Sequence, residues 1–190
     1  MAVTTLDPKS ALVVIDLQNG IASMPTQPHA ASDVIARTVR LAEEFRAHDL
    51  PVVLVRVSFS GPDDVPGRTE AARGAGTATP RPEGWDQVVD VLAPLGDAVV
   101  TKHNWGAFHG TNLDVQLRRR GVTQIVLTGI ATSIGVESTA RAAYEHGYHV
   151  TVVTDAVGDR SLEAHENSVS RIFPRLGETG TTDEVLALLP

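Results

Sequence analysis

Two charged residues follow short apolar runs, and their types suit acid–base chemistry. Asp16 follows the run 11–15, and Lys102 follows the run 98–101. A carboxyl group at the end of a buried strand has a raised pKa unless it gains a partner, which makes Asp16 a candidate general acid or base. A lysine nearby would hold that carboxylate ionised and could stabilise a developing anion. Each residue also has an ordinary explanation, because Asp favours turns and helix caps and most lysines are solvated.

A third candidate is the segment TGIATSIGVESTARAA, residues 128–143, where an apolar run passes through a turn into a helical pattern. The start of that helix, near Ser133 and Gly135, should present unpaired N–H groups and the positive end of the helix dipole. Such a turn can bind an oxyanion or a carboxylate. The alternative is an ordinary strand-to-helix turn whose small residues allow tight packing.

The same segment comes close to a serine-hydrolase motif. Residues 131–135, ATSIG, resemble the Gly-x-Ser-x-Gly nucleophile elbow with Ala in place of the first Gly. The order Ser133, Asp155, His165 also matches the triad order of that fold. We disfavour this reading because the acid and the base would lie only 10 residues apart. The other histidines lack metal-ligand spacing, so we interpret them as surface or packing residues and predict no metal site.

These residues need a scaffold that brings strand ends together, and the hydrophobic pattern predicts one. The apolar runs are continuous rather than alternating, which is typical of strands buried on both faces of a parallel sheet. They cover residues 11–15, 51–57, 98–101, 123–128 and 149–154. Helical patterns lie between and after them, at 31–48, 85–92, 113–120, 136–146, 161–173 (with Pro174 just beyond) and 181–189. We expect an α/β fold with three α-β-α layers, a Rossmann-like open sheet of about six mostly parallel strands, and a site at the strands' carboxyl ends.

Composition limits the classes of protein that remain. The 190 residues are 42% hydrophobic and 21% charged, and they predict one domain over 1–190. The net charge of −7 argues against a nucleic-acid partner. The chain contains no cysteine and no apolar run long enough to cross a membrane, and it starts without a secretory pattern, so we expect a cytoplasmic protein.

One long segment breaks the alternation of strands and helices. Residues 58–84 hold nine Gly or Pro residues and no periodic apolar pattern. Loops of this length are usually functional or disordered. Because this one follows a strand end, we favour a lid or a flap between subunits over simple disorder.

Taken together, the blocks ALVVIDLQNG, TKHNWGAFHGTNLD and GVTQIVLTGIATSIGVESTARAAYEHGYHVTVVTDAVGD resemble the isochorismatase-like, or cysteine hydrolase, superfamily. The resemblance runs over about residues 11–175. In that family an Asp, a Lys and a Cys form the catalytic triad, and the corresponding positions here are Asp16, Lys102 and Gly135. The resemblance also implies a cis peptide bond at Ile130–Ala131. The zinc ligands of the nicotinamidase members have no match here, and we expect no cofactor.

Glycine at the cysteine position changes the chemistry that the resemblance implies. Without a thiol, the thioester route of the amidase members is excluded. Members with Gly at this position hydrolyse a vinyl ether, so Asp16 would be the general acid, Lys102 would orient it and hold a substrate anion, and Gly135 would leave room for the substrate. The pattern VESTARAA, however, looks more like the amidase members. Two alternatives therefore stay open: an Asp–Lys hydrolase of another small metabolite, and a catalytically silent ligand-binding homologue.

The resemblance also implies the surroundings of the site and an assembly. We expect a small-molecule substrate and a homo-oligomer, either a dimer or a tetramer. Phe59 or Arg68 from the long segment could close over the site. The residues expected to contact the substrate are Gln18, Phe59, Trp105, Phe108, Ala131, Thr132 and Ser133.

Overall fold

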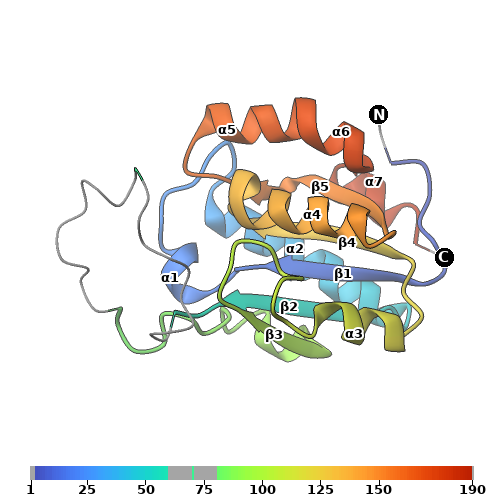
Figure 1. The fold of residues 1–190 in the computed structure, drawn as a ribbon, viewed down its shortest axis with the longest axis horizontal. Coiled ribbons are helices and arrows are strands. Elements are labelled where there is room, and N and C mark those ends of the chain that lie inside the picture. Colours follow the sequence, from blue (N-terminus) through green and yellow to red (C-terminus); the bar gives the residue numbers. More distant parts are fainter. Residues whose placement is uncertain (1–2, 60–69, 71–80, 190) are drawn as a thin grey trace.

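The computed structural model describes residues 3–59, 70 and 81–189, and its centre is one parallel sheet of six strands. The spatial order is β3-β2-β1-β4-β5-β6, and every pair of neighbours is parallel. Figure 1 labels the first five of these strands. The strands are β1 (Ser10–Ile15), β2 (Val52–Val57), β3 (Ala98–Lys102), β4 (Gln124–Ile130), β5 (His149–Gly158) and β6 (Glu178–Gly180). The chain leaves β1 in one direction through β2 and β3 and returns to its other side with β4. The carboxyl ends of β1 and β4 therefore form a topological switch point, where ligands bind in open α/β sheets.

Helices cover both faces of this sheet, and each layer has its own apolar core. On one face, α2 and α7 pack against side chains such as Leu12 and Val126. On the other, α3, α4 and α6 pack against side chains such as Val13 and Leu127. The helices are α1 (Asn19–Ala22), α2 (Ala31–Ala47), α3 (Leu113–Arg119), α4 (Glu137–Glu145), α5 (Leu162–Asn167), α6 (Phe173–Leu176) and α7 (Thr182–Leu186), with a 3₁₀ turn at Ala93–Leu95 and π-helical turns at Thr132–Val136 and Ser168–Ile172. The predicted three-layer fold is confirmed.

The continuous apolar runs form central strands because, as expected, both faces of these strands are buried. All six residues of β1 and all seven of β4 are buried. Helices cover both faces of these strands, so neither face needs polar side chains. The short strand β6 was not among the predicted runs, because Glu178–Gly180 has no apolar pattern.

The predicted helix at 85–92 is wrong. These residues form turns, and Val88 makes an isolated antiparallel bridge with Gln18. Their backbone groups bond across to the segment after β1: the N–H groups of Asn19 and Gly20 donate to the carbonyls of Gln87 and Trp85. Long-range pairing has replaced the local hydrogen bonds that a helix would need.

The predicted helix at 161–173 continues farther than expected. It runs as α5, a π-helical turn and then α6, with Pro174 in the first turn of α6. Proline is tolerated there because the first N–H groups of a helix have no partner within it.

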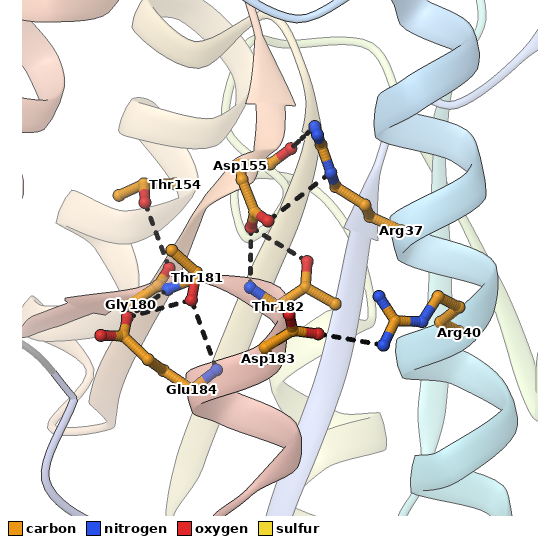
Figure 2. A network of polar contacts seen from close by, with 9 residues as sticks. All are labelled: Arg37, Arg40, Thr154, Asp155, Gly180, Thr181, Thr182, Asp183 and Glu184. Carbon is orange, nitrogen blue, oxygen red and sulfur yellow. Dashed lines mark hydrogen bonds and ion pairs between the residues drawn. The ribbon is translucent and has the colours of Figure 1, made fainter.

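The last helix starts as the sequence predicted. Thr181 caps α7, and Glu184 completes the capping box. Asp155, at the centre of Figure 2, ties this helix to β5 by accepting from the N–H and the hydroxyl of Thr182, and it also pairs with Arg37 of α2. The C-terminal segment is thereby fixed to two other elements.

Most of the long segment at 58–84 lies outside the described residues, and so does Arg68. The interpretation as a lid or flap therefore stays a prediction, as does the single domain. Among the helices that the structure describes, none is long and apolar enough to span a membrane.

Candidate active site

Asp16 is placed by the close approach of β1 and β4. It follows the last residue of β1 with φ 53°, a left-handed conformation that Asp adopts more readily than most residues. Beside it, Gly129 of β4 has φ 124°, and a Cβ there would lie 2.0 Å from the carbonyl oxygen of Ile15. Only glycine permits this close contact between the two strands. The contact places Asp16, which follows Ile15, beside the end of β4.

Lys102 reaches Asp16 from two strands away. It ends β3, in register with Val57 of the intervening β2, so its backbone lies about 9–10 Å from β1. The long stem of lysine spans this gap, and its Nζ lies 2.8 Å from Asp16 Oδ2. The same ammonium donates to the carbonyls of Asn104 at 3.1 Å and Trp105 at 2.8 Å.

These three acceptors match the three protons of the Lys102 ammonium. The side chain is only 2% exposed, so the cation is held almost without water. We expected Lys102 to orient Asp16 and also to hold a substrate anion. Its contacts suit the first role, whereas a substrate anion would have to displace a carbonyl or share a proton.

The carboxyl of Asp16 is asymmetric. Oδ2 binds Lys102, whereas Oδ1 is buried without a hydrogen-bond partner among the described residues. Burial raises the pKa of Asp16 from 3.8 to about 6, while the charge and the hydrogen bond of Lys102 lower it. Desolvation thus outweighs the ion pair, and the pKa of this carboxyl is raised toward neutral pH.

Gly135 completes this centre from the other side. It lies in the π-helical turn before α4, with its Cα facing the Asp16–Lys102 pair. A Cβ built on Gly135 would lie 2.9 Å from Ile15 Cγ2, 3.1 Å from Asp16 Oδ2 and 3.6 Å from Lys102 Nζ. The structure therefore brings Asp16, Lys102 and Gly135 together, and no side chain fits at Gly135 without displacing its neighbours.

The turn between β4 and α4 is held by side chains from beyond β5. The peptide bond Ile130–Ala131 is cis, as the resemblance implied. The N–H and the hydroxyl of Ser133 both donate to Asp159 Oδ2, at 2.7 and 2.8 Å. The expectation that the Ser133 N–H would be unpaired is therefore wrong, because a carboxylate of the protein itself caps it.

The serine-hydrolase alternative finds no support in these contacts. His165 Nδ1 pairs with Thr132 Oγ1 at 2.9 Å, and Ser133 pairs with Asp159. Asp155 binds Thr182 and Arg37 (Figure 2). The three members of the supposed triad thus have separate partners.

Gln18 and Phe59 flank the ends of β1 and β2, but both are engaged in packing. Gln18 is fully buried, and its amide makes hydrogen bonds with both the N–H and the carbonyl of Val57. Phe59 packs on Trp85, and the Arg81 guanidinium lies 4.2 Å from the Phe59 ring centroid. Gln18 therefore braces β2, and contact with a substrate stays a prediction for both residues.

Trp105 and Phe108 both lie in the segment after β3, but their side chains have different surroundings. The Trp105 carbonyl binds Lys102, and its side chain is 61% exposed. The Phe108 ring is buried and stacks on His146, which follows α4 at the end farther from Gly135. The nine residues of α4 span about 13 Å. Phe108 therefore packs in the core near the far end of α4, and its contact with a substrate stays a prediction.

Sequence reasoning missed three residues that shape this site. Asn104 supplies a carbonyl to Lys102, Asp159 caps the turn at Ser133, and the Thr139 hydroxyl donates to the Gly135 carbonyl at 2.7 Å. Of these, only Thr139 had a signal in the sequence, because it lies one helical turn after Gly135. Among the described residues, no group of three His, Asp or Glu side chains is arranged to hold a metal ion.

Comparison with known proteins shows the family to which this chain belongs. The model of the isochorismatase domain matches residues 10–184. The chain belongs to the isochorismatase family. As a member of that family it is a hydrolase.

Several relatives cover nearly the whole chain. An uncharacterized isochorismatase family protein of Escherichia coli O157:H7, YecD, is 44% identical over 95% of this chain and 96% of its own. A solved isochorismatase family protein from Burkholderia thailandensis is 49% identical with a TM-score of 0.89, covering 97% of both chains. The ureidoacrylate amidohydrolase RutB of Pseudomonas syringae is 34% identical, over 93% of this chain and 82% of its own. The isochorismatase family thus includes amidohydrolases among the relatives of this chain.

Proposed function

We propose that this isochorismatase-family hydrolase acts without a protein nucleophile and cleaves the vinyl ether of an isochorismate-like small molecule, with Asp16 as the general acid. The proposal depends on Gly135, to which the resemblance assigns the position of the family's cysteine. Its Cα faces the Asp16–Lys102 pair at a distance that leaves no space for a Cβ. The chain contains no cysteine that could serve instead.

The absence of space at Gly135 favours adaptation over simple loss of the thiol. Had a cysteine only recently been replaced, the volume of its Cβ should remain between Ile15 and Asp16. Instead a Cβ would lie 2.9 Å from Ile15 Cγ2 and 3.1 Å from Asp16 Oδ2. The surroundings have closed around a glycine, which supports a site organised for other chemistry.

The asymmetry of Asp16 fits proton donation. Its proton would reside on Oδ1, because Oδ2 accepts the hydrogen bond from Lys102. The raised pKa, about 6, keeps a useful fraction of the acid protonated near neutral pH while leaving it strong enough to donate.

Hydrolysis of the vinyl ether would proceed through an oxocarbenium ion and a hemiketal. Oδ1–H gives its proton to the terminal CH₂ carbon of the vinyl ether, the π electrons form the new C–H bond, and the ether oxygen stabilises the resulting oxocarbenium ion. Water adds to the cationic carbon and returns a proton to Asp16, which restores the acid. The hemiketal then collapses to a ketone and an alcohol. Lys102 stabilises the Asp16 carboxylate while it lacks its proton.

The test is release of pyruvate from isochorismate by the purified protein. We expect turnover by the wild type and none by Asp16→Asn, which keeps the shape of the side chain but has no acidic proton to donate. Asp183→Asn, the same change at an exposed carboxyl on α7, is the matched control and should keep full activity. Full turnover by Asp16→Asn would contradict the role of Asp16.

A second candidate is hydrolysis of another small metabolite by the Asp–Lys pair, and the similarity to RutB favours a ureido or amide compound. In this case water, activated by the Asp16 carboxylate, would attack the carbonyl directly. If isochorismate yields no pyruvate, release of ammonia from ureidoacrylate by the wild type and not by Asp16→Asn would support this second candidate.

A further inference from the structure

Thr139 occupies a position between the two segments that form the candidate site. It lies on α4, one turn after Gly135, and is fully buried. Its hydroxyl donates to the Gly135 carbonyl at 2.7 Å and accepts from the Ala107 N–H at 3.1 Å. A single hydroxyl thereby connects the turn at Gly135 to the segment that follows β3.

The segment after β3 is the one that holds the Lys102 ammonium. Two of the three acceptors of that ammonium are the carbonyls of Asn104 and Trp105. Next along the chain, Gly106 lies against the first turn of α4, where a Cβ would meet Ser138 at 3.4 Å. Ala107 follows and is anchored by Thr139. The position of Lys102 Nζ therefore depends on where this segment docks on α4.

We propose that Thr139 is a positioning residue, which acts through the segment after β3 to hold the Lys102 ammonium against Asp16 and Gly135. This role rests on the proposed function of Asp16 as the acid, since it sets the distance between the acid and its cationic partner. Thr139 itself lies behind Gly135 and is not placed in contact with a substrate.

The consequence is electrostatic and can be measured. Lys102 is the charged group that lowers the pKa of Asp16 by charge and by hydrogen bond, against burial. If the carbonyls of Asn104 and Trp105 lose their fixed position, the ammonium moves away from Asp16 Oδ2. The pKa of Asp16 should then rise, because less of the lowering contribution remains.

The experiment is a pH titration of the full chain labelled with ¹³C at the aspartate carboxyls, followed by NMR, with the Asp16 signal assigned through its loss in Asp16→Asn. Thr139→Val keeps the volume and removes the hydroxyl, and we expect the pKa of Asp16 to rise by about 0.5 to 1, a fraction of what a whole ion pair contributes. Thr139→Ser keeps the hydroxyl and should restore the wild-type value.

The control and the second variant keep the test decisive. Thr38→Val is the matched control, because Thr38 is equally buried, lies on α2 and has a hydroxyl without a partner among the described residues. It should leave the pKa of Asp16 unchanged. Should Thr139→Val fail to fold, Thr139→Ala removes the same hydroxyl without crowding and should give the same rise.

An unchanged Asp16 pKa in the folded Thr139→Val or Thr139→Ala protein would overturn the proposal, and Thr139 would then be a packing residue only. The titration needs no substrate. A failure of isochorismate turnover therefore does not affect it, and the two proposals fail separately.

Discussion

At Asp16, burial and a cation shift the pKa in opposite directions, and burial prevails. The result is a carboxyl with a pKa of about 6, in which Lys102 holds Oδ2 while Oδ1 has no hydrogen-bond partner in the part of the chain that the structure describes. A buried carboxylate is normally satisfied on both oxygens. The exception at Oδ1 marks the atom at which we expect the chemistry to occur.

This pKa predicts the pH dependence of turnover. A general acid works only when protonated, so kcat/KM should be level below about pH 6 and fall about tenfold per pH unit above it. The measurement is the initial rate of pyruvate release from isochorismate between about pH 5 and pH 8. A rate that rises with pH through this range would instead indicate that Asp16 acts as a base.

At Gly135, the prediction concerns stability. Gly135→Ala should lower the free energy of unfolding by about 1–3 kcal/mol, because the added methyl overpacks a filled site. Gly106→Ala is the control, since its Cβ would meet Ser138 at 3.4 Å, an ordinary contact. Denaturant unfolding of both variants measures the difference.

Gly135→Cys tests the same contact chemically. The thiol would enter a site that has closed around glycine, so we expect similar destabilisation and no amidase activity. A Gly135→Cys protein that is as stable as the wild type and hydrolyses ureidoacrylate would show that this chain is an amidase lacking only its thiol.

Among the elements, α7 depends on a polar network rather than on length. It has five residues, and Asp155 secures it through Thr182 and pairs with Arg37 of α2 (Figure 2). Asp155→Ala should lower the free energy of unfolding by about 1–3 kcal/mol by leaving these partners unsatisfied, and turnover should be kept. A loss of turnover without a loss of stability would return Asp155 to the role of a triad acid.

The control for that network lies on the same helix. Asp183 pairs with Arg40 at 3.0 Å, but its side chain is 81% exposed. Because exposed ion pairs contribute little, Asp183→Ala should change the stability by less than about 1 kcal/mol.

The interface of α2 with the sheet contains two buried hydroxyls without partners among the described residues, those of Thr38 and Thr128. Valine has nearly the same shape and no polar atom. Thr128→Val should therefore raise the free energy of unfolding by about 1 kcal/mol, measured by denaturant unfolding. A decrease would mean that this hydroxyl is satisfied in solution.

For the whole molecule, the hydrophobic pattern of the sequence predicted the longer strands of the sheet better than the short edge strand β6 and the connecting segments. Continuous apolar runs predicted the five longer strands and placed Asp16 and Lys102 at one edge, since parallel strands share a carboxyl end. The strand Glu178–Gly180 was missed because an edge strand of three residues needs no apolar pattern. The prediction of a helix at 85–92 failed because the pairing of this segment with residues 17–20 leaves no local pattern in the sequence.

The site was predictable where a residue follows a strand and less so in the connecting segments. The position of Asp16 follows from the strand it ends, whereas the direction of Phe108 depends on how a loop folds. Likewise, the capping of Ser133 by Asp159 joins residues 26 positions apart, which no local spacing records.

The most direct test of the central claim is hydrolysis of isochorismate in D₂O, with the pyruvate analysed by NMR. Acid catalysis by Asp16 delivers a solvent-derived deuteron to the CH₂ carbon, so the pyruvate methyl formed by the wild type should carry one deuterium, and Asp16→Asn should form no pyruvate. Pyruvate formed equally fast by Asp16→Asn, or no pyruvate from the wild type at any pH, would contradict the account.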